Sequence, residues 1–263
     1  MKYCRFAGAD GPQFGRVDER DGEFWMTGRM ASPLSPEAEV DGNFEPVRIS
    51  ALSLLAPVAP SKIVCVGRNY LDHAKELGNE APAEPLLFFK PPSALLEPGG
   101  VIRMPRVAER VDFEGELAVI IGRRARRLRR DEDLSTYIHG FTLANDVTAR
   151  DLQKKDGQWT RAKGFDTFCP VGPVVETELD LAAGLTIDTH VNGELRQRGS
   201  TLDFIFTLPV LLEYITAAMT LEPGDLLLTG TPAGVGPLAT GDVVEVSLPG
   251  LGRLLNPVEA EPD

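Results

Sequence analysis

The sequence predicts a β-rich α+β protein, in which a sandwich or roll of strands carries a few peripheral helices. Short alternating or apolar segments bounded by Gly, Pro and Asp recur along the chain, whereas clear helical periodicity is confined to residues 204–219. Asn192-Gly193 follows an alternating run, which is a strong hairpin signal. With 263 residues, the chain is long enough for one large domain with a small appendage.

The N-terminal segment, residues 1–57, consists of short alternating runs separated by Asp, Gly and Pro, which predicts a small antiparallel β domain. Pro57 and Pro60 mark the connection to a second domain over residues 58–263. The first buried strand of that domain is expected at residues 62–67. It ends in a glycine turn that opens a helix over residues 70–77.

The remaining elements are expected in chain order. They are a continuous buried strand at 111–122, a polar and partly helical segment at 152–166, a strand at 185–191, a helix at 204–219, and a strand, glycine loop and strand over 225–247. Six arginines at 123–130 precede three acids at 131–133, which indicates a solvated turn after a strand. A phosphate or polyanion site is the alternative interpretation of these arginines.

Composition excludes several classes of protein. The hydrophobic content of 43% and charged content of 25% are those of a globular protein, and the net charge of −12 argues against nucleic acid as a partner. No apolar stretch approaches the roughly 20 residues that span a bilayer, and the N-terminus lacks the apolar region of a signal peptide. Three scattered cysteines fit a reducing compartment. We therefore expect a cytoplasmic protein that binds neither nucleic acid nor membrane.

Three acids indicate a metal site. Glu114 and Glu116 are two apart in the predicted strand and so share a face, and Asp146 ends a later apolar run. Like charges held together repel each other, and a divalent cation stabilises such an arrangement. Three carboxylates without nearby His or Cys favour Mg²⁺, Mn²⁺ or Ca²⁺ over zinc. The alternative is a pair of surface acids on a solvated strand.

Other residues suit catalysis. Glu76 lies one helical turn after His73, where a carboxylate orients an imidazole and raises its basicity; an ordinary surface pair is the alternative. Lys163 is suited to neutralise a substrate carboxylate or an oxyanion, unless it is an ordinary loop lysine. Thr231 lies in a glycine-rich loop whose amides and hydroxyls can hold an anion. This loop lacks the features of a nucleotide-binding loop.

The order of these pieces resembles the fumarylacetoacetate hydrolase superfamily, most closely its bacterial and mitochondrial members of the acylpyruvase type. The blocks that carry the resemblance cover about residues 60–250. They are the segments 62–76, 113–122, 145–153, 162–173, 191–197 and 227–236. The N-terminal segment also looks like the small β domain that precedes the catalytic domain in many members.

The resemblance implies a mixed β-sandwich roll, a homodimer, and Mg²⁺ or Mn²⁺ held by Glu114, Glu116 and Asp146, with Ca²⁺ as a substitute in crystals. It implies a catalytic set and a substrate-binding set. The catalytic residues are His73 and Glu76, on a mobile lid helix, and Lys163; the substrate-binding residues are Arg150, Gln153, Lys163 and Thr231. Gly164 stands where many relatives carry serine, so one hydroxyl contact to the substrate is not expected.

The activity implied is hydrolysis of a C–C bond in an acylpyruvate-type 1,3-diketo acid. The small 2-oxo acid substrate would chelate the metal, and His73 with Glu76 would activate a water whose attack expels a metal-stabilised pyruvate enolate. The resemblance leaves other reactions open at the same site. They are oxaloacetate decarboxylation, isomerisation or decarboxylation of a 2-hydroxydienedioate, and dehydration of sugar acids. A non-catalytic, metal-dependent small-molecule binding protein is the rival from another class. It would not need a base.

Overall fold

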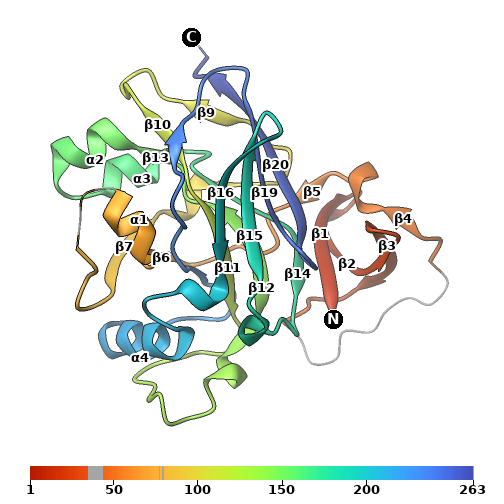
Figure 1. Cartoon of the computed structure of the whole chain (residues 1–263). Helices are drawn as coiled ribbons and strands as arrows, with labels where there is room; N and C mark the ends of the chain where they lie inside the picture. Colours follow the sequence, from red (N-terminus) through yellow and green to blue (C-terminus); the bar gives the residue numbers. More distant parts are fainter. Residues whose placement is uncertain (35–43, 77, 79, 263) are drawn as a thin grey trace.

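The computed structural model describes residues 1–34, 44–76, 78 and 80–262. Strands dominate, which confirms the β-rich prediction. The helices α1 (Leu71–Glu76), α2 (Arg150–Asp156) and α3 (Thr160–Gly164) gather on one side of the strands, and α4 (Leu208–Ala218) lies below them (Figure 1). None of the helices in these described ranges is long and apolar enough to cross a bilayer.

The largest sheet runs through the whole molecule in the order β4-β3-β2-β1-β14-β12-β11-β17-β6-β7. Its strands are β4 (Val47–Arg48), β3 (Glu23–Met30), β2 (Gly11–Arg20), β1 (Lys2–Gly8), β14 (Cys169–Glu176), β12 (Ile138–Asn145), β11 (Gly115–Ile121), β17 (Leu226–Leu228), β6 (Ile63–Gly67) and β7 (Leu86–Lys90). Most pairs are antiparallel, but β17 and β6 are parallel. The sheet is therefore mixed. Two short strands lie off this path: β5 (Leu54–Leu55) pairs with β1, and β8 (Leu95–Leu96) pairs with β14.

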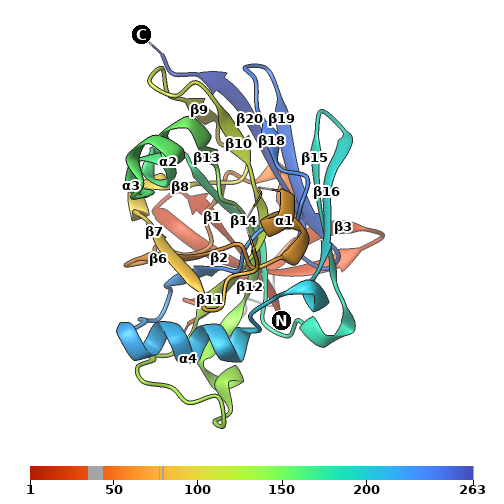
Figure 2. The same cartoon turned by 60° about the vertical axis from the view of Figure 1, so that its left-hand side comes forward.

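A second sheet packs on the central strands and completes a sandwich. It has the order β16 (Glu194–Ser200), β15 (Thr186–Val191), β19 (Val243–Leu248), β20 (Gly252–Ala260) and β9 (Ile102–Met104). Apolar side chains of β11 and β12, such as Val119 and Leu143, meet Ile187 and Val246 of this sheet in one buried cluster that also contains the inner face of α4. In Figure 1 the strands of this second sheet lie in front of β11 and β12, and Figure 2 shows the same arrangement turned by 60°. This apolar layer is the main core.

The prediction of one continuous strand over 111–122 is wrong at Glu114. The chain leaves β10 (Val111–Phe113), which belongs to a small sheet with β13 (Thr148–Ala149) and β18 (Gly236–Pro237), and enters β11 of the large sheet one residue later. Between them the Glu114 amide donates to Asn145 Oδ1 at 2.9 Å, which replaces a ladder bond. Gly115 fits the crossing because a Cβ there would lie 2.0 Å from Thr189 Oγ1.

Several local predictions are confirmed. Asn192 and Gly193 have φ of 53° and 80° between β15 and β16, as a type I′ hairpin turn requires. The strand expected at 62–67 is β6, and the helix expected over 70–77 is α1, with residue 77 outside the described residues. The segment 152–166 is more helical than predicted, since it contains α3 and most of α2.

One further prediction changed in detail, and the preferred interpretation of the arginine turn is supported. The helix expected over 204–219 starts only at Leu208, because Phe204 bridges Tyr70 and the Phe206 amide bonds to Asn69 Oδ1. Acids face the arginine turn, with Arg124 3.1 Å from Glu222. These contacts favour the solvated turn over a polyanion site.

The N-terminal strands extend the large sheet, because β1 pairs with β14 through Lys2↔Glu176 and Tyr3↔Val175. The Glu176 carboxylate accepts from the Met1 ammonium at 2.9 Å and lies 2.8 Å from Lys2 Nζ. Burial alone would raise the pKa of Glu176, but these cations outweigh it and hold the pKa at about 2. The division into domains at residue 57 stays a prediction.

Candidate metal and substrate site

Three buried carboxylates converge where the two sheets meet the helices. Glu114 follows β10, Glu116 is on β11, and Asp146 directly follows β12. One oxygen from each of the three lies within 4.8 Å of the others. The pairing of Gly115 with Asn145 and the bond from the Asp146 amide to the Glu114 carbonyl, 2.8 Å, bring these separated segments together. The convergence predicted from sequence is therefore present, although Glu114 is outside a strand.

Lys163 bridges two of the three acids. Its Nζ, on α3, is 2.9 Å from Glu114 Oε2 and 2.5 Å from Asp146 Oδ2, and the side chain is almost fully buried. Arg150, at the start of α2, bonds to Glu114 Oε1 and, at 2.9 Å, to Asp112 Oδ2. Both cations therefore hold the acids in place. Neither is an ordinary surface residue.

The third acid, Glu116, has a different electrostatic environment. Burial raises the pKa of Glu116 well above 4.5, and the charges of Asp146 and Glu114 raise it further, although the Gly230 amide donates to its Oε2 at 2.7 Å. Burial would also raise the pKa of Glu114, but the positive charges of Arg150 and Lys163 outweigh burial and lower this pKa. Glu116 thus carries the unrelieved repulsion of the trio.

These residues fit a hard divalent cation. All the donors are carboxylate oxygens, and Asp146 Oδ1 is buried without a hydrogen bond from the described residues, although Lys90 Nζ approaches it to 2.6 Å. A divalent charge between the trio would favour the ionised form of Glu116, because it offsets the repulsion from the other two acids. Glu114, Glu116 and Asp146 are therefore the residues that could hold the metal.

Sequence reasoning gave no role to Lys90, Asp112 or Gln197. Lys90, at the end of β7, is fully buried, and its Nζ also donates to the carbonyls of Val147 and Lys163 at 2.9 and 2.8 Å. The one local signal was a cation ending an apolar run. Asp112 anchors Arg150, and Gln197 connects Gly115 to Thr231.

His73 and Glu76 face the same cavity from α1. The imidazole Nδ1 is 3.4 Å from Glu76 Oε2, and the Gly234 amide lies 3.1 Å from both Glu76 oxygens. Burial lowers the pKa of His73 below its ordinary 6.5, against the opposing influence of Glu114 and Glu76. The ring is therefore neutral at pH 7 and able to accept a proton.

Gln153 and Thr231, two of the predicted substrate-binding residues, also line this cavity. They differ in which hydrogen-bonding groups remain available to a ligand. Gln153, on α2, accepts a bond from Arg150 Nη1 at 3.0 Å, and its Nε2 has no partner among the described residues. Thr231 Oγ1 donates to the Gly115 carbonyl at 2.9 Å and accepts from Gln197 Nε2 at 2.7 Å. The Thr231 proton is committed to the protein, so this hydroxyl can offer a ligand only an acceptor lone pair.

All the predicted site residues line one cavity of 510 Å³ beneath α1, α2 and α3. Its walls also contain Arg68, Lys154 and an aromatic pair, Phe88 and Trp159, whose ring centroids are 5.1 Å apart. The structure thus brings together His73, Glu76, Glu114, Glu116, Asp146, Arg150, Gln153, Lys163 and Thr231. The cavity can hold a small anion against a metal, and α1 supplies a neutral base, His73, to the same cavity.

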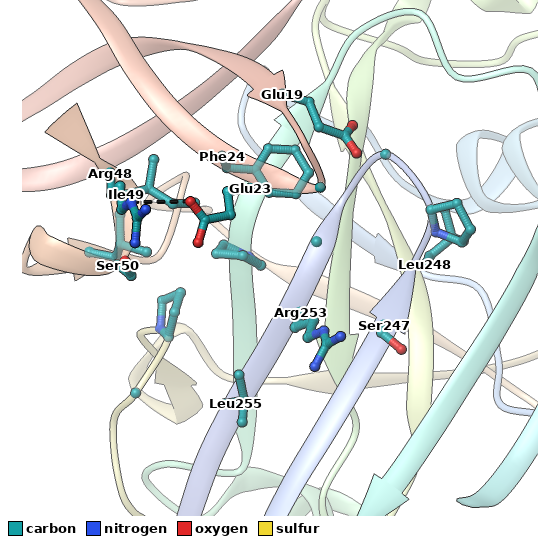
Figure 3. Close-up of a pocket in the computed structure, with 18 of the residues that line it drawn as sticks. Glu19, Glu23, Phe24, Arg48, Ile49, Ser50, Ser247, Leu248, Arg253 and Leu255 are labelled. Atoms are coloured by element: carbon teal, nitrogen blue, oxygen red, sulfur yellow. Dashed lines mark ion pairs between the residues drawn. The ribbon is translucent and has the colours of Figure 1, made fainter. Parts of the chain in front are cut away.

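A larger cavity, of 970 Å³, lies between the N-terminal strands and the β19–β20 hairpin (Figure 3). Two ion pairs line it: Arg48 is 3.1 Å from Glu23, and Arg198 is 2.7 Å from Asp188. The Phe24 ring lies against the hairpin, since a Cβ at Gly252 would come within 3.0 Å of it. We call it the N-terminal groove. The converging acids and the neutral base described above belong to the smaller cavity, which is the candidate site.

The chain is similar in sequence to several proteins that are named as enzymes. The chain is 42% identical over 224 residues to oxaloacetate tautomerase YisK of Bacillus subtilis, which covers 80% of this chain and 74% of that protein. It is 45% identical over 199 residues to the mitochondrial oxaloacetate decarboxylase of Dictyostelium discoideum, and the match covers 72% of this chain and 89% of that protein.

Among solved structures, 2-hydroxyhepta-2,4-diene-1,7-dioate isomerase from Mycobacterium marinum is 42% identical and superimposes with a TM-score of 0.88 over the full length of both chains. This match confirms the mixed sandwich together with the N-terminal strands. Residues 62–259 match the family described as fumarylacetoacetate (FAA) hydrolase C-terminal. The chain therefore belongs to the fumarylacetoacetate hydrolase family.

Proposed function

We propose that the protein is a divalent-metal-dependent enzyme that promotes enol chemistry of a small 2-oxo acid. The observation that carries the proposal is the presence, in one 510 Å³ cavity, of three converging carboxylates and a buried, neutral His73 held by Glu76. A binding protein would need the acids but not the base. When bound by Glu114, Glu116 and Asp146, Mg²⁺ or Mn²⁺ would supply Lewis acidity toward the oxygens of the substrate.

The chain's own residues divide the remaining work. Lys163 fixes two carboxylates and leaves its ammonium group on the cavity wall, where it can orient an anionic substrate. Gln153 offers an amide N–H to a substrate oxygen. His73 can take a proton from the carbon beside the 2-oxo group, because its ring is neutral and Glu76 stabilises the imidazolium that forms.

Enol chemistry on oxaloacetate is the reaction that we favour. Two relatives bear the names oxaloacetate tautomerase and oxaloacetate decarboxylase, and the named isomerase acts on a 2-hydroxydienedioate, which is an enol of a 2-oxo acid. Tautomerisation and isomerisation move a proton on the carbon skeleton next to the 2-oxo group, for which one base suffices. Decarboxylation breaks the C–C bond there, releases CO2 and leaves an enolate that takes up a proton, so the three reactions share an enol or enolate of a 2-oxo acid. The site does not require a water to be placed for attack.

Hydrolysis of an acylpyruvate-type C–C bond, the activity expected from the sequence, is the second candidate. The observation that favours it is the carboxylate–imidazole pair, which is the arrangement used to activate water. The same His73 would then remove a proton from water rather than from carbon.

A side-by-side assay tests the proposal. The purified protein, stripped with a chelator and reloaded with Mg²⁺ or Mn²⁺, is given oxaloacetate, acetopyruvate and 2-hydroxyhepta-2,4-diene-1,7-dioate. We expect metal-dependent tautomerisation or decarboxylation of oxaloacetate above the rate with metal alone. Faster cleavage of acetopyruvate would favour the second candidate. Failure to transform any of them, with the metal bound, would refute the proposal.

Assembly and location also remain proposals. We infer a cytoplasmic homodimer, supported by the family resemblance and by three free cysteines that are all buried. Light scattering on the purified chain measures the assembly state. A mass of one chain would contradict the dimer.

A further inference from the structure

Four cationic side chains line the candidate site, and they fall into two groups. Arg150 and Lys163 are buried and hydrogen-bonded to carboxylates of the site. Arg68 and Lys154 line the same cavity, but their side chains make no ion pair or hydrogen bond within the described ranges of the chain. Positive charge is therefore available on the wall beyond the charge that the acids already use.

The backbone at Arg68 is unusual. Its φ is 57°, in the left-handed region where glycine, asparagine and aspartate are the common residues. The neighbouring Asn69 holds the turn, because its Nδ2 donates to the Thr229 carbonyl at 2.8 Å and its Oδ1 accepts from the Phe206 amide at 2.7 Å. A charged residue kept in a strained conformation that its surroundings enforce points to a functional role.

The position of Arg68 suits contact with the end of a substrate. Gly67 packs so closely that a Cβ there would lie 3.2 Å from the Trp159 ring, so the turn that carries Arg68 is fixed against the aromatic wall. Lys154 follows Gln153 on α2. Arg68 and Lys154 line the cavity that contains the acids, so they are the cations on its wall that remain available to a substrate anchored at the acids.

We propose that Arg68, assisted by Lys154, binds a second carboxylate of the substrate, so that the enzyme selects 2-oxo dicarboxylates over 2-oxo monocarboxylates. The inference rests on the proposed function, which supplies the anchored 2-oxo acid end. A guanidinium binds a carboxylate through two parallel hydrogen bonds, which gives geometric selection as well as charge. Glu76, on the same cavity, would repel a dianion that met no such partner.

The test uses two substrates that differ only in the terminal carboxylate, oxaloacetate and 2-oxobutanoate. Exchange of the C3 protons with solvent deuterium, followed by NMR with the Mg²⁺-loaded enzyme, reports enol formation for both. We expect Arg68→Gln to lower the ratio of kcat/KM for oxaloacetate to kcat/KM for 2-oxobutanoate by about 10- to 100-fold, chiefly through KM for oxaloacetate. Arg68→Lys retains charge and should recover part of this ratio.

Matched variants complete the design. Lys154→Gln should lower the ratio by a smaller factor, whereas Lys155→Gln, the exposed neighbour that does not line the cavity, should leave it unchanged. Each variant is checked for unchanged Mg²⁺ affinity by calorimetry and for unchanged thermal unfolding. If Arg68→Gln folds poorly, Arg68→Lys and Lys154→Gln decide between a lowered and an unchanged ratio.

The outcomes separate the two proposals. A ratio that is unchanged in Arg68→Gln overturns this inference while the proposed function stands, and so does a wild-type enzyme that treats both substrates alike. Absence of enzymatic exchange on either substrate overturns the proposed function and this inference together. A lowered ratio with intact metal affinity supports both.

Discussion

The candidate site and the N-terminal groove both carry acids and bases, but in opposite arrangements. In the groove, acids pair with arginines near the surface, as in the Arg48–Glu23 pair, whose side chains are 55% and 49% exposed (Figure 3). In the site, Glu114, Glu116 and Asp146 are buried together. The groove is nearly twice as large, at 970 against 510 Å³.

The comparison shows that cavity size does not identify the chemistry here. An exposed, paired charge changes stability by at most about 1 kcal/mol, so it can be present without a function. Buried like charges oppose each other and must be stabilised by partners or by a ligand. We therefore expect substitutions of charged residues to have large effects in the site and small effects in the groove.

The largest effect is expected for Glu116→Ala. The change removes one of the three converging carboxylate ligands, so Mn²⁺ affinity should fall by more than about 100-fold and turnover should be lost with it. Calorimetry with Mn²⁺ and the oxaloacetate assay measure the two losses. Wild-type Mn²⁺ affinity in this variant would show that the trio is not the metal site.

His73→Gln should separate metal binding from catalysis. We expect turnover to fall by about 10²- to 10⁴-fold, the range for loss of a general base, while Mn²⁺ affinity stays within about twofold, because the imidazole is not among the converging donors. Steady-state kinetics and Mn²⁺ titration are compared in the same preparation. Full turnover by this variant would refute the assigned base.

The pH profile sharpens the role of His73. Burial disfavours the imidazolium and lowers the pKa below 6.5, so the neutral base is present at pH 7 and is lost only as the pH falls through that lowered value. The acidic limb of kcat/KM should therefore lie below pH 6.5 and be absent from the residual activity of His73→Gln. A limb above pH 6.5 would contradict a buried, neutral ring.

Lys90→Met tests the buried cation that sequence analysis overlooked. The change leaves Asp146 without its 2.6 Å partner and removes donors to two carbonyls, so we expect destabilisation of about 3–5 kcal/mol in the absence of metal. Saturating Mn²⁺ should restore part of it, because the metal favours the folded state. Denaturant unfolding with and without Mn²⁺ measures both. Wild-type stability would show that Lys90 is dispensable.

The smallest effect is expected in the groove. Glu23→Gln removes one partner of the exposed Arg48–Glu23 pair, so the free energy of unfolding should change by less than about 1 kcal/mol, with unchanged turnover and Mn²⁺ affinity. This variant also serves as the control for Glu116→Ala. A loss of activity in Glu23→Gln would give the groove a role in catalysis.

Much of the site could be predicted because its key residues occur in short, local sequence patterns. The spacing of Glu114 and Glu116 within an apolar run, and an Asp at the end of another, indicated converging carboxylates before any fold was known. The hairpin at Asn192-Gly193 was predictable for a similar reason, since left-handed backbone favours these residue types. Residue type and short spacing are sufficient where the physical cause is local.

By itself, the sequence therefore determined the β-rich class, the acid trio and the histidine–glutamate pair. The tertiary structure alone decided which charges meet: Lys90 reaches Asp146 across 56 residues, and the chain changes sheets at Glu114 because Asn145 takes its amide bond. It also decided that Arg150 and Lys163 are occupied by carboxylates while Arg68 is not. These are contacts between distant segments, and they depend on strand order, which no local pattern of residues encodes.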